Sequence, residues 1–314
     1  MMHVPITIRD EKSDTTAEVA PTLGFNCFRL CVGGPEALTE VLWSAPDFLA
    51  GQSKPSHSGI PLMFPFAGRL RGTSFEFAAL RYTLEAGDGR GNAIHGFVLT
   101  RPWRATQPSA DRVVGTFQAS RDDAALLARW PADFRITADY RVAARSLVCE
   151  YLIENPDDKP LPFGFGTHPY FRVPLGGPSA AECIVQVPVS TAWELVDLLP
   201  TGKIAPASVA AELSAGMPFG KMELDNVFGG LAFENHRAAA SVRDPGSKRA
   251  MTMTFDDQNT ACVVYNPPHR QAVCIEPYTT APDAFYLQSQ GIDPHLRVLA
   301  PGASFRTRIE IHVS

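Results

Sequence analysis

Two runs of alternating apolar and polar residues follow each other directly in residues 134–153, FRITADYRVAARSLVCEYLI. In the second run Leu147, Cys149 and Tyr151 share one face, and the residues between them share the other, which is the period of a β-strand. Residues 143–145 separate the two runs and predict a hairpin turn. The stretch therefore predicts two antiparallel strands that each have one buried face.

The same pattern recurs along the chain. Residues 260–265 and 271–275 predict two further strands joined by a turn at 266–270, and residues 304–314 predict a strand entered through a turn at 300–302. The 27 prolines and 24 glycines break the chain into short segments of this kind. Such spacing favours a large antiparallel β-sandwich over alternating βαβ units.

Helical signals are few. Residues 122–129 begin with acidic and end with basic side chains, which suits a short helix, and residues 206–213 carry a proline at the first position of a second. No internal repeat and no low-complexity linker divides the chain. We expect one all-β domain over residues 1–314 with few short helices.

Composition narrows the functional class. Hydrophobic residues make up 45% and charged residues 19% of the chain, so a sizeable core can form. The net charge of −5 gives no reason to expect a nucleic acid or an anionic membrane as partner. The first ten residues do not resemble a signal peptide, and no apolar run is long enough to cross a membrane. We expect a cytoplasmic protein.

Cysteine usage agrees with a reducing compartment. None of the six cysteines forms a Cys-x-x-Cys pair, and several occupy apolar strand positions where a free thiol behaves as a small hydrophobic side chain. We expect neither disulfides nor a structural metal site. The six are Cys27, Cys31, Cys149, Cys183, Cys262 and Cys274.

His168 and Glu276 are the strongest candidates for chemistry. His168 ends the apolar segment 161–167, where an imidazole can exchange a proton near neutral pH, although a packed structural histidine is the common alternative. Glu276 follows an apolar run and precedes Pro277, which we expect to end the strand. A buried carboxylate needs a partner or a raised pKa, and a structural ion pair explains this as well as catalysis does. We interpret the two as an acid and a base that face each other across a substrate.

Three more residues are candidates for binding. His95 lies in a glycine-rich loop, Arg69 emerges from an apolar run with Arg71 close by, and Asp225 follows Leu224. A guanidinium offers a fork of donors that suits neighbouring hydroxyls or a carboxylate. Each has an ordinary structural alternative: a turn histidine, a solvated arginine pair and a turn-starting aspartate. No nucleophile elbow, phosphate-binding loop or zinc-protease motif is present in the sequence.

In order along the chain, seven segments resemble the aldose 1-epimerase (mutarotase) family. Any one of them is weak evidence, but seven in the correct order are specific. The segments are 59–69, ending in Arg69; 92–96, with His95; 155–171, with His168; 198–202; 224–225, with Asp225; 275–277, with Glu276; and 299–302.

The chain also departs from the family pattern. Many galactose-type members have asparagine where Gly68 stands, a second glycine where Phe97 stands and asparagine where Arg172 stands. The proton-transfer pair is intact while the sugar-contacting residues differ. The resemblance therefore supports the fold and the reaction class better than the identity of the sugar.

The resemblance implies a large β-sandwich with a sugar site on its concave face. Glu276 would act as base on the anomeric hydroxyl and His168 as acid on the ring oxygen, and Arg69, His95 and Asp225 would hold the sugar. No cofactor and no metal would be required, and we expect a monomer or a weak homodimer. Two alternatives remain: an epimerase of a phosphorylated sugar, for which Arg71 and Arg172 could supply basic charge, and a non-catalytic carbohydrate-binding protein.

Overall fold

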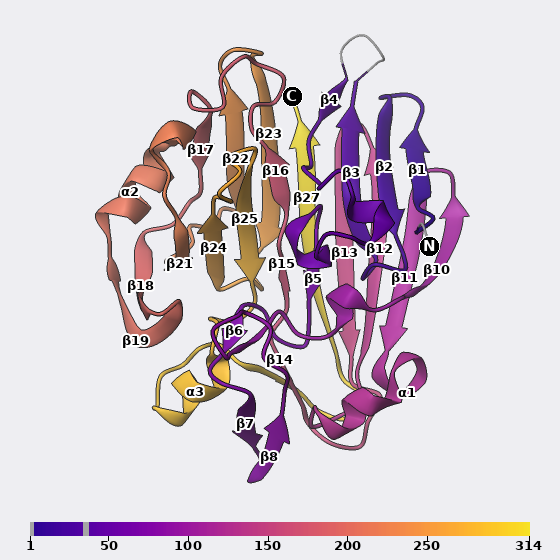
Figure 1. Ribbon diagram of the computed structural model, residues 1–314, viewed down its shortest axis with the longest axis vertical. Coiled ribbons are helices and arrows are strands. Elements are labelled where there is room, and N and C mark those ends of the chain that lie inside the picture. The colour runs from indigo at the N-terminus through magenta and orange to yellow at the C-terminus, as the bar shows by residue number, and fades with distance from the viewer. Residues whose placement is uncertain (1–2, 34–37) are drawn as a thin grey trace.

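The computed structural model describes residues 3–33 and 38–314, and most of its strands belong to three antiparallel sheets (Figure 1). The prediction of an all-β antiparallel fold is confirmed. The two strands predicted from residues 134–153 are β12 (Arg135–Ala143) and β13 (Ser146–Glu154). Ala144 and Arg145 form the turn between them with φ of 48° and 65°, the left-handed conformation that two-residue hairpin loops require.

This hairpin lies in a nine-stranded sheet that forms one face of the molecule. In order across the sheet, the strands are β10 (Arg104–Ser109), β11 (Arg112–Gln118), β12, β13, β27 (Ser304–Val313), β23 (Arg249–Asp256), β22 (Arg237–Asp244), β17 (Ile184–Gln186) and β20 (Met217–Pro218).

A second sheet of eight strands carries the candidate site residues His168, Asp225 and Glu276 or their immediate neighbours. Its order is β19 (Leu199–Pro206), β18 (Thr191–Val196), β21 (Asp225–Gly229), β24 (Ala261–Tyr265), β25 (Ala272–Tyr278), β15 (Gly166–Thr167) and β5 (Leu62–Met63), with β16 (Tyr170–Arg172) also paired to β25.

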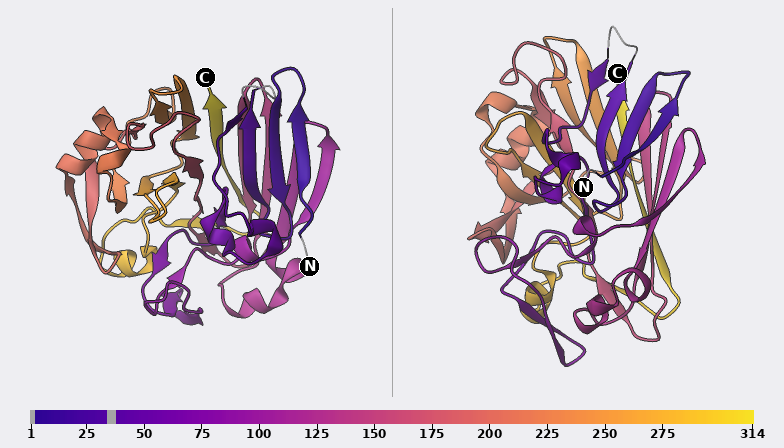
Figure 2. Two further views of the ribbon diagram at one scale, coloured as in Figure 1. Left: turned by 45° about the horizontal axis from the view of Figure 1, so that its top comes forward. Right: turned by 45° about the vertical axis from the view of Figure 1, so that its right-hand side comes forward.

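A third sheet of four strands packs against β11 and β12 of the nine-stranded sheet, as the indigo and magenta ribbons of Figure 2 show. Its strands are β1 (Ile6–Asp10), β2 (Thr15–Ala20), β3 (Asn26–Val32) and β4 (Thr39–Glu40). Three two-stranded antiparallel pairs complete the described strands: β6 (Arg69–Leu70) with β9 (Ala93–Ile94), β7 (Ser74–Phe77) with β8 (Leu80–Thr83), and β14 (Leu161–Phe163) with β26 (Arg297–Leu299).

One apolar core joins the three sheets. Ile153 of β13, Leu30 of β3 and Ile275 of β25 all belong to a single cluster of buried side chains. Since successive residues of a strand point to opposite faces, Ile275 points into this core and its neighbours Cys274 and Glu276 point away from it. The six cysteine thiols are free and buried, as predicted.

The helices are short, and the boundaries that we predicted for them are only partly correct. Instead of one helix over 122–129, α1 (Ala119–Asp122) ends where that segment begins, and a 3₁₀ turn at Ala124–Ala128 follows the non-helical Asp123, which has φ of −159°. The second predicted helix is α2 (Ser208–Ala215), and Pro206 instead ends β19. A third helix, α3 (Ala284–Ser289), has no counterpart in the prediction. No helix among the described residues is both long and apolar enough to traverse a bilayer.

Pro277 does not end its strand, contrary to the prediction. Strand β25 continues through Pro277 to Tyr278, and Pro277 pairs with Cys262 of β24. The strand continues because its pairing with β24 holds it on one side, while on the other side the ladder is interrupted where Pro277 lies.

Candidate active site

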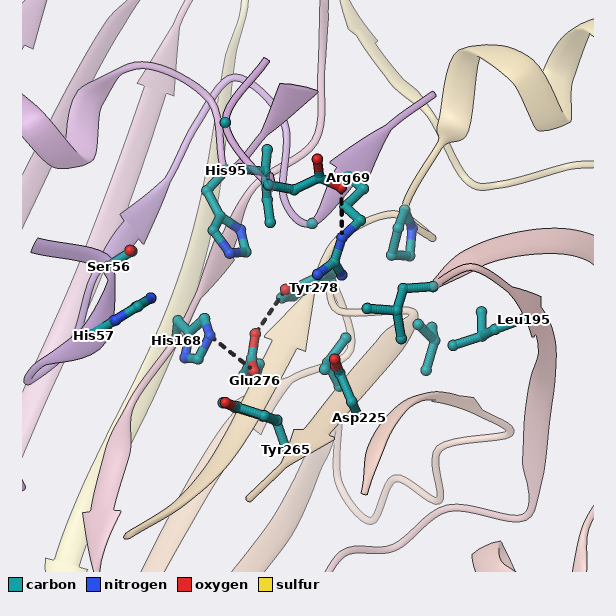
Figure 3. A pocket seen from close by; sticks show the side chains of 18 of the residues that line it. Ser56, His57, Arg69, His95, His168, Leu195, Asp225, Tyr265, Glu276 and Tyr278 are labelled. Atoms are coloured by element: carbon teal, nitrogen blue, oxygen red, sulfur yellow. Dashed lines mark hydrogen bonds and ion pairs between the residues drawn. The ribbon is translucent and has the colours of Figure 1, made fainter. Parts of the chain in front are cut away.

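A cavity of about 340 Å³ lies over the eight-stranded sheet (Figure 3). All five residues that the sequence singled out line it: Arg69, His95, His168, Asp225 and Glu276. They come from segments far apart in the chain, and the tertiary fold brings them together. A volume of this size is at the lower end of small-ligand sites.

The pairing register explains why these side chains face the cavity together. Across the sheet, Asp225 pairs with Tyr265, Tyr265 with Cys274, and Cys274 with Tyr170. Residues directly opposite each other in an antiparallel sheet project from the same face. Glu276 lies two positions beyond Cys274 and therefore shares that face.

His168 lies opposite Glu276 in the same register. Gly166 pairs with Tyr278 and Tyr170 pairs with Cys274, so the position midway between them joins His168 to Glu276. The His168 Nε2 atom is 3.2 Å from Oε1 of Glu276, and both side chains are buried.

Two prolines create the gap in the ladder at this point. Thr279 N donates to Phe165 O and Val173 N donates to Gln271 O, and such bonds recur at every second pair. The two backbone hydrogen bonds on either side of the His168–Glu276 pair would have to be donated by residues 277 and 169. Both are prolines, which have no N–H group. His168 and Glu276 thus occupy a non-hydrogen-bonded pair, the type in which side chains approach most closely.

The structure corrects one part of the sequence interpretation. His168 and Glu276 do not face each other across the width of a substrate, because they are adjacent on one wall of the cavity (Figure 3). A substrate must therefore approach both groups from the same side.

Glu276 and His168 each have a tyrosine neighbour that the sequence analysis did not identify. The Tyr278 hydroxyl donates to Oε2 of Glu276 at 2.7 Å. The Tyr170 ring stacks on the His168 ring with centroids 4.8 Å apart and planes within 3°. Both tyrosines lie two residues after the group they contact, so the period of a strand could have indicated them.

Burial dominates the electrostatics of the pair. Removal from water raises the pKa of Glu276 well above its ordinary value, and the Tyr278 hydrogen bond opposes this shift. The same effect, with a smaller contribution from His95, lowers the pKa of His168 well below its ordinary value. Each shift favours the uncharged form of its group, and the 3.2 Å between Nε2 of His168 and Oε1 of Glu276 is within reach of proton transfer.

Arg69 lies on β6 and His95 directly follows β9, and both line the cavity (Figure 3). The Nε of Arg69 donates to the buried Asp88 carboxylate at 3.2 Å, which fixes the guanidinium. Burial, reinforced by the charge of Arg69, lowers the pKa of His95 to about 3, so its imidazole is neutral. Its Nδ1 atom is buried without a hydrogen-bond partner among the described residues.

The loop around Arg69 and His95 depends on two glycines. Gly68 has φ of 67°, a left-handed conformation that glycine adopts readily and asparagine occasionally. Gly96 has φ of 70°, and a Cβ atom there would lie 2.1 Å from the Phe64 carbonyl oxygen. Phe97, at the second departure, is buried in the core.

Asp225 begins β21 and is not a turn residue. Within the described part of the chain its carboxylate has no hydrogen-bond or ion-pair partner. Partial burial raises its pKa, and the charge of Arg69 opposes this shift. The carboxylate is thus available to accept hydrogen bonds from a ligand.

Arg71 and Arg172 do not line this cavity. Arg71 pairs with Asp283 at 3.1 Å and Arg172 pairs with Glu40 at 2.7 Å. Their charges are matched by these carboxylates and lie outside the set of residues around His168.

Among the described residues, His168, Cys274 and Glu276 form a group that could hold a metal ion. Their ligating atoms lie within 4.8 Å of one another. Burial raises the pKa of the Cys274 thiol well above its ordinary value, which opposes the thiolate form that binds metals.

Known proteins share this architecture. A structure of a galactose mutarotase-like protein from Clostridium acetobutylicum superposes with a TM-score of 0.85 at 18% identity, covering 100% of this chain and 99% of the other. A GalM/aldose epimerase homologue from C. elegans superposes with a TM-score of 0.79 at 18% identity, covering 99% of each chain.

Sequence comparison extends over the same length. The uncharacterized protein YphB of Escherichia coli is 23% identical over 303 residues, which cover 93% of this chain and 98% of YphB. The family model described as aldose 1-epimerase matches residues 7–312, almost the whole of the chain. With its β-sandwich and its match from end to end, this chain belongs to the aldose 1-epimerase family.

Proposed function

We propose that this protein is an aldose 1-epimerase that interconverts the α and β anomers of a free aldose. The observation that carries the proposal is the contact between Nε2 of His168 and Oε1 of Glu276 at 3.2 Å on the wall of a cavity of about 340 Å³. In this proposal the pair shares one proton, so one group acts as the acid and the other as the base. The exchange of anomers needs one acid and one base, because one oxygen must lose a proton while another gains one.

Glu276 is the base and His168 is the acid in this proposal. The Tyr278 hydrogen bond and the charge of Arg69 both lower the pKa of Glu276 against the effect of burial, so they stabilise its carboxylate form. With the carboxylate formed, the shared proton resides on His168. The alternative arrangement, with the proton on Glu276, differs only by transfer across the same contact.

Adjacency of the two groups suits the reaction. The anomeric hydroxyl and the ring oxygen of a pyranose are bonded to the same carbon, so an acid and a base on one wall can reach both. Glu276 removes the proton of the anomeric hydroxyl while His168 protonates the ring oxygen, and the C–O bond of the ring breaks. The aldehyde rotates by half a turn about its bond to C2, and the reverse transfers close the ring as the other anomer.

Arg69, His95 and Asp225 hold the sugar in this proposal. Arg69 is fixed by Asp88 and presents the remaining guanidinium donors, and His95 is neutral, with an Nδ1 atom that no described residue bonds. Asp225 offers an acceptor that is likewise without a partner in the described part of the chain. Together they position hydroxyl groups and take no part in proton transfer.

The alternatives have less support. A phosphorylated sugar would call for basic charge near the reacting pair, and Arg71 and Arg172 are paired with carboxylates outside the cavity. A binding protein would have no need of a buried carboxylate in contact with an imidazole, an arrangement that is costly to desolvate and typical of functional sites.

Polarimetry of freshly dissolved α-glucose and α-galactose tests the proposal. We expect the wild type to accelerate mutarotation and both His168→Ala and Glu276→Gln to reduce kcat/KM by roughly 10²–10⁴-fold, which corresponds to about 3–5 kcal/mol of barrier. His236→Ala and Glu223→Gln are matched controls at exposed positions outside the cavity. Mutarotation no faster than in buffer for a broad panel of aldoses would refute the proposed activity.

A further inference from the structure

Tyr265 lines the cavity and was not among the predicted site residues. It is the last residue of β24 and lies between Asp225 and Cys274 in the register of the sheet. Its ring packs against the buried cluster formed by Tyr170, Ala272 and Cys274, which holds the ring in place.

The hydroxyl group of Tyr265 is free to bind a ligand. No described residue gives it a hydrogen bond, whereas the hydroxyl groups of the neighbouring Tyr170 and Tyr278 are bonded to Ser56 O and Glu276. The Tyr265 ring presents its edge to the His168 ring with centroids 6.4 Å apart, and Figure 3 shows its hydroxyl directed toward the His168–Glu276 pair.

The order of the strands indicates which part of a sugar lies near Tyr265. His168, Glu276 and Tyr265 come from three neighbouring segments of the sheet, about 4.8 Å apart, and Tyr265 lies diagonal to Glu276 because it pairs with Cys274. With the ring oxygen at His168 and the anomeric hydroxyl at Glu276, the remaining ring bond of the anomeric carbon points away from His168. That bond leads to C2, on the side of β24.

We propose that Tyr265 is a specificity-determining residue that hydrogen-bonds the C2 hydroxyl of the aldose. The inference rests on the proposed function and on its assignment of His168 and Glu276 to the two oxygens. A phenol both donates and accepts, so it suits a hydroxyl partner. Partial burial raises the pKa of Tyr265, so the phenol keeps its proton at neutral pH. The protein accordingly favours aldoses with a C2 hydroxyl over their 2-deoxy counterparts.

A cycle of enzyme and substrate deletions tests this role. The kcat/KM of the wild type and of Tyr265→Phe is measured for glucose, 2-deoxyglucose, 3-deoxyglucose and 6-deoxyglucose. Because each deoxy sugar also differs in intrinsic reactivity, the ratio of wild type to variant is compared for each sugar. We expect this ratio to be roughly three- to tenfold for glucose and about one for 2-deoxyglucose, the effect of a single uncharged hydrogen bond.

The other two sugars and a second variant provide the controls. We expect 3-deoxyglucose and 6-deoxyglucose to show the same ratio as glucose. Tyr82→Phe, which changes a tyrosine that stacks on Phe75 outside the cavity, should leave all four values unchanged. If the ratio of wild-type to Tyr265→Phe kcat/KM is the same for all four sugars, Tyr265 has a structural role only. If the ratio is one for 3-deoxyglucose or 6-deoxyglucose alone, Tyr265 contacts a different hydroxyl group. Either result overturns the proposal.

Calorimetric titration of the same sugars separates this proposal from the proposed activity. If the wild type does not accelerate mutarotation, the proposed activity is refuted, and the Tyr265 contact is still tested by the affinity for sugars. Tyr265→Phe is then expected to bind glucose roughly three- to tenfold more weakly and 2-deoxyglucose equally well. Unchanged affinity for glucose in such a protein would overturn the contact.

Discussion

Removing the Tyr278 hydroxyl tests the assignment of base and acid. In Tyr278→Phe the ring stays and the 2.7 Å donor to Oε2 of Glu276 is lost. This donor stabilises the carboxylate and lowers the pKa of Glu276, so its loss raises that pKa further. A hydrogen bond to a charged group contributes about 1.5–3 kcal/mol, and one pKa unit corresponds to about 1.4 kcal/mol. The expected rise is therefore about 1–2 units.

The assay is the pH profile of kcat/KM, which reports the ionisation of the free enzyme. If Glu276 acts as the carboxylate base, activity falls as the pH falls through its pKa. The acid limb of the profile in Tyr278→Phe should then lie about 1–2 pH units above that of the wild type. Tyr286→Phe is a matched control, because this tyrosine lies outside the cavity with its ring beneath Arg71. An acid limb that stays in place while Tyr278→Phe remains active would refute Glu276 as the base.

Two further predictions concern the charges in the cavity. Burial raises the pKa of Glu276. Above about pH 4.3 the folded protein therefore keeps a proton that the unfolded chain releases. The stabilisation that this proton provides is lost as the pH rises toward the pKa of Glu276 in the folded protein. Glu276→Gln has no carboxyl group to titrate at this position, so its free energy of unfolding should rise relative to that of the wild type as the pH increases from 5 to 7, by up to about 1.4 kcal/mol per pH unit. Urea unfolding measures this difference, and a difference that does not change with pH would contradict the raised pKa of Glu276. Asp225→Asn should leave the unfolding free energy within about 0.5 kcal/mol of the wild type, since no described partner is lost, and should raise KM for the sugar severalfold; an unchanged KM would exclude Asp225 from binding.

Local pattern identified the strands and the candidate residues. The alternation in residues 134–153 predicted β12 and β13 because a half-buried strand leaves a period of two in its side chains. The polar residues that interrupt apolar segments at His168 and Glu276 were visible for the same reason. Boundaries were less accurate at Asp123, which is not helical, and at Pro277, where pairing with a neighbouring strand overrides local propensity.

The partners of the arginines could not be predicted. Arg69 and Arg71 are two residues apart, yet their positions differ. Arg69 lines the cavity and pairs with Asp88, whereas Arg71 pairs with Asp283, just before α3. Arg172 pairs with Glu40 of β4, from a different sheet. Such pairs join segments that are distant in the chain, so local sequence carries no signal for them.

The sequence by itself determined an antiparallel β protein of the aldose 1-epimerase family and indicated its candidate site residues, because alternation, turn residues and motif order are local properties of the chain. Only the tertiary structure decided that His168 and Glu276 touch on one wall, and that Tyr265 and Tyr278 stand beside them. The physical reason is register: the hydrogen bonds between distant strands align position 168 with position 276, and the burial that follows from this alignment shifts both pKa values.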